Sequence, residues 1–157
     1  MLLFVTRSEE EEAMSDADDK YSSDEEVSEV VRRFESCEFQ PTEFKHRLHL
    51  TVALSYLLTS PYSVALERMR RSLRRFLSHH RVDPRVYNET LTVFWMRRVL
   101  AFVEQADVSR GLAELANELL DACGDSRLVF DYYSKERLDS DKARRLWTDS
   151  DLRPIDF

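Results

Sequence analysis

Two glycines and four prolines are all that this chain of 157 residues contains. Glycine supplies the positive φ angles of tight hairpin turns and the close backbone approach of phosphate-binding loops. So few glycines argue against an all-β fold, a P-loop and a dinucleotide-binding fingerprint. The length fits one domain. We therefore predict a single all-α domain of packed helices.

The composition is compatible with a compact body in an aqueous compartment. Hydrophobic residues are 43% of the chain and charged residues 34%, which is enough for a core inside a heavily charged surface. No run of about 18 apolar residues exists, so we predict no membrane span. The opening MLLFV is too short for a signal-peptide core, and an acidic run follows it. We expect a cytoplasmic protein in which Cys37 and Cys123 are reduced thiols.

Negative charge is concentrated at the beginning of the chain. Residues 1–29 carry eleven acidic and two basic side chains, and since the whole chain has a net charge of −7, residues 30–157 carry about +2. Residues 1–22 are acidic, Ser-rich and poor in apolar residues, which predicts a disordered tail. Met14 opens a stretch that itself resembles a bacterial start, so translation of residues 1–13 stays open. The near-neutral body argues against nucleic acid as a partner.

Helical periodicity predicts a bundle of five main helices. A capping box from Ser23 to Glu26 opens the first helix, and Asp107 or Ser109 caps the fifth. The five helices are expected over about 23–37, 41–59, 61–80, 87–105 and 107–123. The second and the fourth have no polar face, so we expect them at the centre.

The end of the chain consists of shorter apolar and capped pieces. Ser134 and Ser140 can each cap a short helix, the later one running to Trp147, and together these form a helical C-terminal cap. We divide the chain into a tail over 1–22, a bundle domain over 23–150 and a C-terminal tail over 151–157.

Two histidines break the apolar character of the second helix. His46 and His49 are three residues apart, so their side chains lie about 60° from each other on one helix face. Histidines placed in this way can share a metal ion or form an acid–base pair. The alternative is a pair of hydrogen-bonded core histidines.

Glu89 begins an apolar stripe on the fourth helix. Burying an unpaired carboxylate costs several kcal/mol, so Glu89 needs partners. His46 and His49 are suitable if the second and fourth helices are neighbours, and the three side chains would then form a metal or catalytic site. The alternative is that Glu89 only caps backbone amides at the start of its helix.

Three motifs carry a resemblance over about residues 40–150. They are F-x-H-x-x-H-L from Phe44, Y-N-E-T-L-T from Tyr87, and Y-Y-S…L-x-S-x-x-A-R ending at Arg144. The chain resembles a family of small uncharacterised bacterial helical proteins with these motifs. The resemblance adds weight to the motif residues and implies no particular reaction. We predict that Tyr87, Asn88, Tyr133 and Arg144 are ligand-binding residues of the pocket. The family has histidine where this chain has Asn88, which weakens the expectation of a zinc site.

The third helix carries a basic face formed by Arg68, Arg70, Arg71, Arg74, Arg75 and Arg81. Arginines on one face bind phosphates and carboxylates well. The alternative is a solvated face that pairs with nearby acids or with the acidic tail.

Three functional hypotheses follow. The first is a buried polar pocket between the two central helices that binds a small polar or anionic ligand. The second is a metal-assisted or acid–base enzyme with Glu89 as general base and His46 and His49 as ligands or acids. The third is an interaction protein that uses the arginine face. The sequence identifies no cofactor and no oligomeric state.

Overall fold

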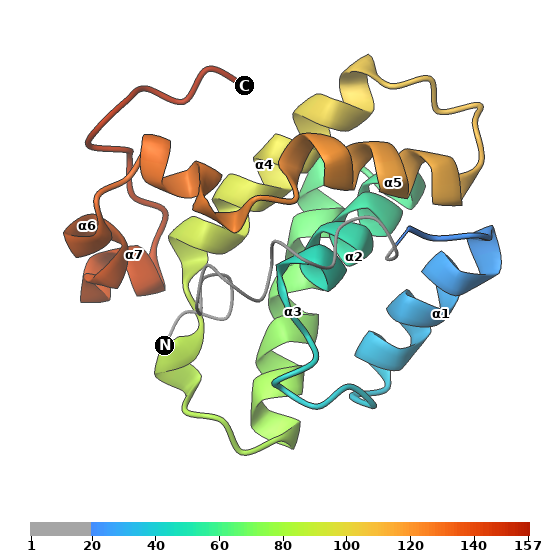
Figure 1. The fold of residues 1–157 in the computed structure, drawn as a ribbon. Helices are drawn as coiled ribbons and strands as arrows, with labels where there is room; N and C mark the ends of the chain where they lie inside the picture. The colour runs from blue at the N-terminus through green and yellow to red at the C-terminus, as the bar shows by residue number, and fades with distance from the viewer. Residues whose placement is uncertain (1–19) are drawn as a thin grey trace.

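The computed structural model describes residues 20–157, and this part of the chain contains helices and no strand (Figure 1). The prediction of an all-α bundle with five main helices is confirmed. These are α1 (Asp24–Glu35), α2 (His46–Thr59), α3 (Tyr62–His79), α4 (Glu89–Gln105) and α5 (Leu112–Cys123). The short helices α6 (Lys135–Asp139) and α7 (Asp141–Arg145) and the 3-10 turns η1 (Pro84–Val86) and η2 (Ser126–Asp131) complete the described part. Of the tail predicted as disordered, residues 1–19 lie outside the described residues.

Helix α2 lies at the centre of the bundle. It packs against α1, α3, α4 and α5, and its buried positions run around the helix from His46 to Leu57. A helix that is apolar on every side can bury all of its side chains only when other helices surround it. The start of α4 lies against α7 (Figure 1), so the C-terminal cap covers the side of α4 that the bundle leaves open.

Residues 20–22, which the sequence assigns to the disordered tail, are held against the bundle. The backbone of Tyr21 and the side chain of Asn117 exchange two hydrogen bonds of 2.9 Å each. The Tyr21 hydroxyl lies 3.0 Å from the hydroxyl of Thr51. The predicted disorder is therefore wrong for residues 20–22, because the tyrosine ties this segment to two helices far along the chain.

Helix α2 begins at His46, five residues after the predicted start at Pro41. The intervening residues form a turn in which the Phe44 amide donates to the Gln40 carbonyl at 3.2 Å. The Phe44 ring stacks on Phe34 with centroids 4.3 Å apart. This burial holds the chain outside helical geometry, so His46 is the first residue of the helix.

The start of α5 also differs from the prediction. Asp107 accepts hydrogen bonds from the amide and hydroxyl of Ser109 in a local turn, and the helix begins only at Leu112. The Ala113 amide instead donates to the carboxylate of Asp24 in α1 at 2.8 Å. A cap contributed by another helix leaves no signal in the local sequence.

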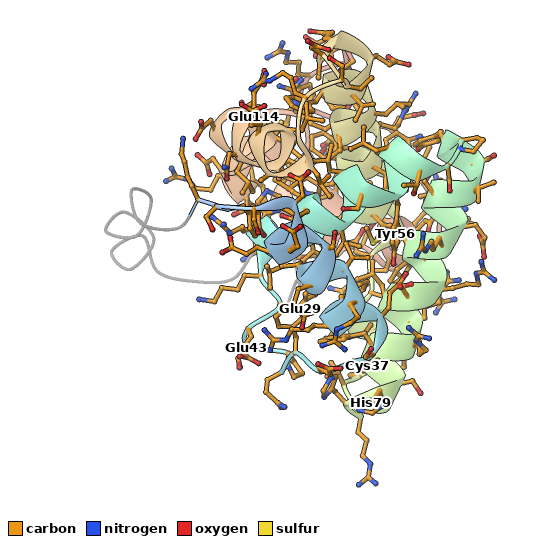
Figure 2. All side chains as sticks on the ribbon, turned by 90° about the vertical axis from the view of Figure 1, so that its right-hand side faces the viewer. Glu29, Cys37, Glu43, Tyr56, His79 and Glu114 are labelled. Carbon is orange, nitrogen blue, oxygen red and sulfur yellow. The ribbon has the colours of Figure 1, made fainter. Side chains whose placement is uncertain are left out.

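After α1 and after α3, the chain has a non-glycine residue at a position whose backbone conformation favours glycine. Cys37 and Arg81 have φ angles of 56° and 54°, in the left-handed region that is costly for residues with a Cβ. Each lies at the C′ position of a Schellman motif, in which two amides turn back to bond the last carbonyls of the helix. The bonds are Cys37 to Phe34 and Glu38 to Arg33 after α1, and Arg81 to Ser78 and Val82 to Leu77 after α3. Figure 2 shows Cys37 and His79 at the same end of the bundle.

Gly124 has a different role at the end of α5. Its φ angle is ordinary, but an added Cβ would lie 2.5 Å from the Leu120 carbonyl oxygen. Glycine is needed there for close approach.

The C-terminal segment lies back over the bundle. Helix α7 ends at Arg145, two residues before the predicted end. The Leu152 amide donates to the Tyr132 carbonyl at 3.0 Å. The Phe157 ring packs edge-on against the rings of Phe94 and Tyr132.

Candidate functional site

His46 is a buried residue that joins α2 to the end of α5. Its Nε2 lies 3.0 Å from the Cys123 carbonyl oxygen, which can only accept, so Nε2 carries the proton. The ring lies edge-on to Trp95 with centroids 4.3 Å apart. Burial lowers the pKa of His46 from 6.5 to about 4, although the bond to Cys123 partly opposes this. His46 is therefore a neutral imidazole near pH 7.

His49 lies one turn further into the core. Its ring contacts Phe44 with centroids 4.2 Å apart. Burial, followed by the proximity of His46, lowers the pKa of His49 well below 6.5. The two histidines lie close enough to influence each other, and both are set in aromatic surroundings.

Glu89 belongs to a different cluster. Arg70 of α3 donates from Nε at 2.9 Å and from Nη2 to the same carboxylate oxygen. The Tyr87 hydroxyl donates to the other oxygen at 2.6 Å. Burial and this bond raise the pKa of Tyr87 well above its usual range. Both oxygens of the buried Glu89 carboxylate therefore accept hydrogen bonds, one from Arg70 of α3 and the other from Tyr87, which precedes the N-cap Asn88.

The predicted set of three is divided between these clusters. The hydrogen-bond partner of His46 is the Cys123 carbonyl of α5, whereas the guanidinium that pairs with Glu89 is in α3. No group of three or more His, Cys, Asp or Glu side chains among residues 20–157 lies together as metal ligands. His46, His49 and Glu89 therefore do not form a metal-ligand set in this arrangement.

The other residues of the predicted site fasten the C-terminal cap. The Asn88 side chain accepts from the Leu91 amide at 3.0 Å and donates to the Leu138 carbonyl at 2.8 Å. The Tyr133 hydroxyl donates to the Thr148 carbonyl at 2.8 Å. Arg144 donates to the carbonyls of Asp139 and Arg85. These bonds link the second and third sequence motifs to each other through the backbone of the cap.

The sequence did not predict that Thr90 also binds the C-terminal cap. Its hydroxyl donates to the Leu146 carbonyl at 2.9 Å and accepts from the Thr148 amide at 3.2 Å. A fully buried threonine in the first turn of an apolar helix needs such partners. The available signal in the sequence was the position of this threonine within an apolar stretch.

The arginines on α3 and at its C-terminal end divide into two groups. Arg68 pairs with Glu35 at 2.5 Å, and Arg70 pairs with Glu89 and with Glu67. The second group, which we call the arginine surface, comprises Arg71, Arg74, Arg75 and Arg81. All four are exposed, and none has a carboxylate partner among residues 20–157. Arg74 lies over the Tyr87 ring at 4.7 Å, and Arg75 donates to the Glu35 carbonyl.

The acids near the arginine surface already have partners. Glu67 pairs with Arg70 at 3.6 Å, and Asp83 pairs with Arg85 at 2.8 Å. The Arg85 guanidinium and amide lower the pKa of Asp83 to about 2. Positive charge on the second half of α3 is therefore left uncompensated within the described residues.

Comparison with family models, with curated proteins and with solved structures finds no match to this chain. The resemblance carried by the three motifs stays a prediction. No helix in residues 20–157 combines the length and the apolar character that crossing a membrane requires.

Proposed function

We propose that this protein is a binding module that recognises an acidic polypeptide segment through its arginine surface. The supporting observation is that Arg71, Arg74, Arg75 and Arg81 are exposed while the nearby carboxylates pair with other arginines. The first three are spaced at i, i+3 and i+4, so they share one face of α3. Guanidinium groups bind carboxylates through paired, directional hydrogen bonds.

The choice of partner rests on charge. A nucleic-acid interface needs a strongly basic body, whereas residues 30–157 carry only about +2. An acidic peptide needs only a local basic surface, which the second half of α3 provides. Duplex DNA is therefore the competing ligand that the experiment includes.

The two hypotheses centred on His46, His49 and Glu89 have less support. A general base must offer a free lone pair to the proton that it takes, but the Glu89 carboxylate accepts from Arg70 and Tyr87. Nε2 of His46 donates to the backbone of Cys123, and the lone pair on its Nδ1 is buried. These groups are arranged to hold the core together.

The test compares two charge-reversed variants of the full chain. Fluorescence anisotropy of a labelled oligoglutamate peptide is measured with wild type, with Arg71→Glu/Arg75→Glu, and with Lys142→Glu/Arg145→Glu. The second pair is exposed on α7 and gives the same change in net charge. We expect the α3 variant to lose about tenfold or more in affinity, or about 1.4 kcal/mol, and the α7 variant to bind like wild type.

Thermal melts establish that both variants fold, and raising the salt concentration must weaken the wild-type complex because exposed charges are screened. Equal binding by wild type and the α3 variant would overturn the proposal. Tighter binding of a labelled DNA duplex than of the peptide would overturn the choice of partner.

A further inference from the structure

A second site lies away from the arginine surface, at the C-terminal end of the chain. A cleft of about 520 Å³ is lined by Arg97, Trp147 and residues 149–155. Small-molecule sites usually occupy about 300–1,000 Å³. We call this the C-terminal cleft. None of the sequence motifs points to it.

The C-terminal segment that lines the cleft is held in place by hydrogen bonds. The Asp151 carboxylate accepts from the amide and the hydroxyl of Ser134, at 2.8 and 2.6 Å. The Leu152 amide donates to the Tyr132 carbonyl, and Asp156 accepts from the Tyr132 hydroxyl at 2.9 Å. The cleft therefore exists before any ligand binds, which reduces the entropy that binding costs.

The charged groups of the cleft fall into two classes. Asp151 is engaged by Ser134 and lies 3.8 Å from Arg137, and Arg153 pairs with Asp156 at 2.5 Å. The side chains of Arg97 and Asp149, in contrast, are exposed, and within residues 20–157 neither side chain makes a hydrogen bond or an ion pair. The Arg97 guanidinium lies over the Trp147 ring, 5.3 Å from its centroid.

One available cation, one available anion and an aromatic ring thus line the same cleft. Leu152, which is 59% exposed, adds an apolar side chain to the wall. We infer that the C-terminal cleft binds a small zwitterion of the free amino-acid class. Its carboxylate pairs with Arg97, its ammonium pairs with Asp149, and its apolar side chain lies against Trp147 and Leu152.

The two opposite charges in the cleft discriminate a zwitterion from ligands that carry a single charge. A plain anion would leave the Asp149 carboxylate facing it without compensation, and a plain amine would do the same to Arg97. A ligand with both charges satisfies both groups at once, and like-charge repulsion rejects the others. The inference is independent of the arginine surface, which lies on α3 and the turn that follows it.

Isothermal titration calorimetry of the full chain tests the inference with three probes of one size. L-phenylalanine carries both charges, 3-phenylpropionate lacks the ammonium, and phenethylamine lacks the carboxylate. We expect saturable binding of phenylalanine, with each analogue weaker by about tenfold or more. Arg145→Gln, outside the cleft lining, must leave all three affinities unchanged.

Two variants assign the charges to their partners. Arg97→Gln should abolish the preference for phenylalanine over phenethylamine, and Asp149→Asn should abolish the preference over 3-phenylpropionate. A merely structural role would lower all three affinities together. The inference is overturned if phenylalanine shows no saturable binding up to about 10 mM, where even millimolar affinities are measurable. Equal wild-type affinity for phenylalanine and 3-phenylpropionate also overturns it.

Discussion

The side chain of Asn88 bonds the start of its own helix and the C-terminal cap at the same time. Its Oδ1 accepts from the Leu91 amide, and its Nδ2 donates to the carbonyl of Leu138, fifty residues along the chain. The residue that resembles a ligand-binding position in the sequence is thus a structural bridge between α4 and α6.

Replacing Asn88 by alanine removes both bonds. We expect the free energy of unfolding to fall by roughly 2–3 kcal/mol, because the cap contributes about 1 kcal/mol and a buried carbonyl loses its donor. Urea denaturation measures the change. Asn88→Asp keeps the capping oxygen but cannot donate to Leu138 when it is ionised, so it separates the two contributions. A loss below about 0.5 kcal/mol in Asn88→Ala would show that the bridge does not stabilise the fold.

The pair formed by Arg70 and Glu89 gives a second prediction. Arg70→Met leaves a buried carboxylate with Tyr87 as its remaining partner, and we expect a loss of roughly 2–4 kcal/mol, reduced because the Arg70 side chain is 28% exposed. Arg70→Met/Glu89→Leu removes both charges and should recover most of that loss. Denaturant midpoints of the two single variants and the double variant complete the cycle. Strictly additive losses would contradict the pairing.

The pKa of His46 makes stability depend on pH. In the unfolded chain this imidazole takes up a proton near pH 6.5, but in the folded protein only near pH 4, because of burial. The unfolded state therefore binds more protons between these values, so stability is fully present above pH 6.5 and falls as the pH decreases toward 4. We expect a loss of roughly 3 kcal/mol from His46 across this window.

Carboxylates also titrate in acid, so the measurement is a comparison of slopes. Urea midpoints of wild type and His46→Gln are followed from about pH 7.5 to about pH 4, and the variant should show a shallower decline because glutamine does not titrate there. His79→Gln, at an exposed position at the end of α3, should decline like wild type. Parallel curves for wild type and His46→Gln would refute the assignment.

Local signals predict the helices and the central position of α2, because apolar periodicity is a property of a short stretch of sequence. They also identify His46, His49 and Glu89 as buried polar groups. The partners are not predictable in the same way. Glu89 takes the guanidinium of Arg70, a residue that the sequence assigns to a solvated face, because α3 passes beside the start of α4.

The same reason explains the shifted helix boundaries. Asp24 caps α5 although it precedes Ala113 by 89 residues in the sequence. The stacking of Phe34 on Phe44 delays the start of α2. Both effects are tertiary contacts that override local preference. The C-terminal cleft escapes prediction altogether, because Arg97 and Asp149 are brought together only when the chain returns over α4.

The left-handed backbone of Arg81 places stability and recognition in opposition. Glycine there would remove the strain of a Cβ at positive φ, and we expect Arg81→Gly to gain about 0.5–1 kcal/mol in thermal and urea unfolding. The same change deletes one guanidinium of the arginine surface and should weaken the peptide complex. A more stable variant that binds less would mean that the chain keeps a strained residue for the sake of its charge, a trade-off that selection for stability alone would remove.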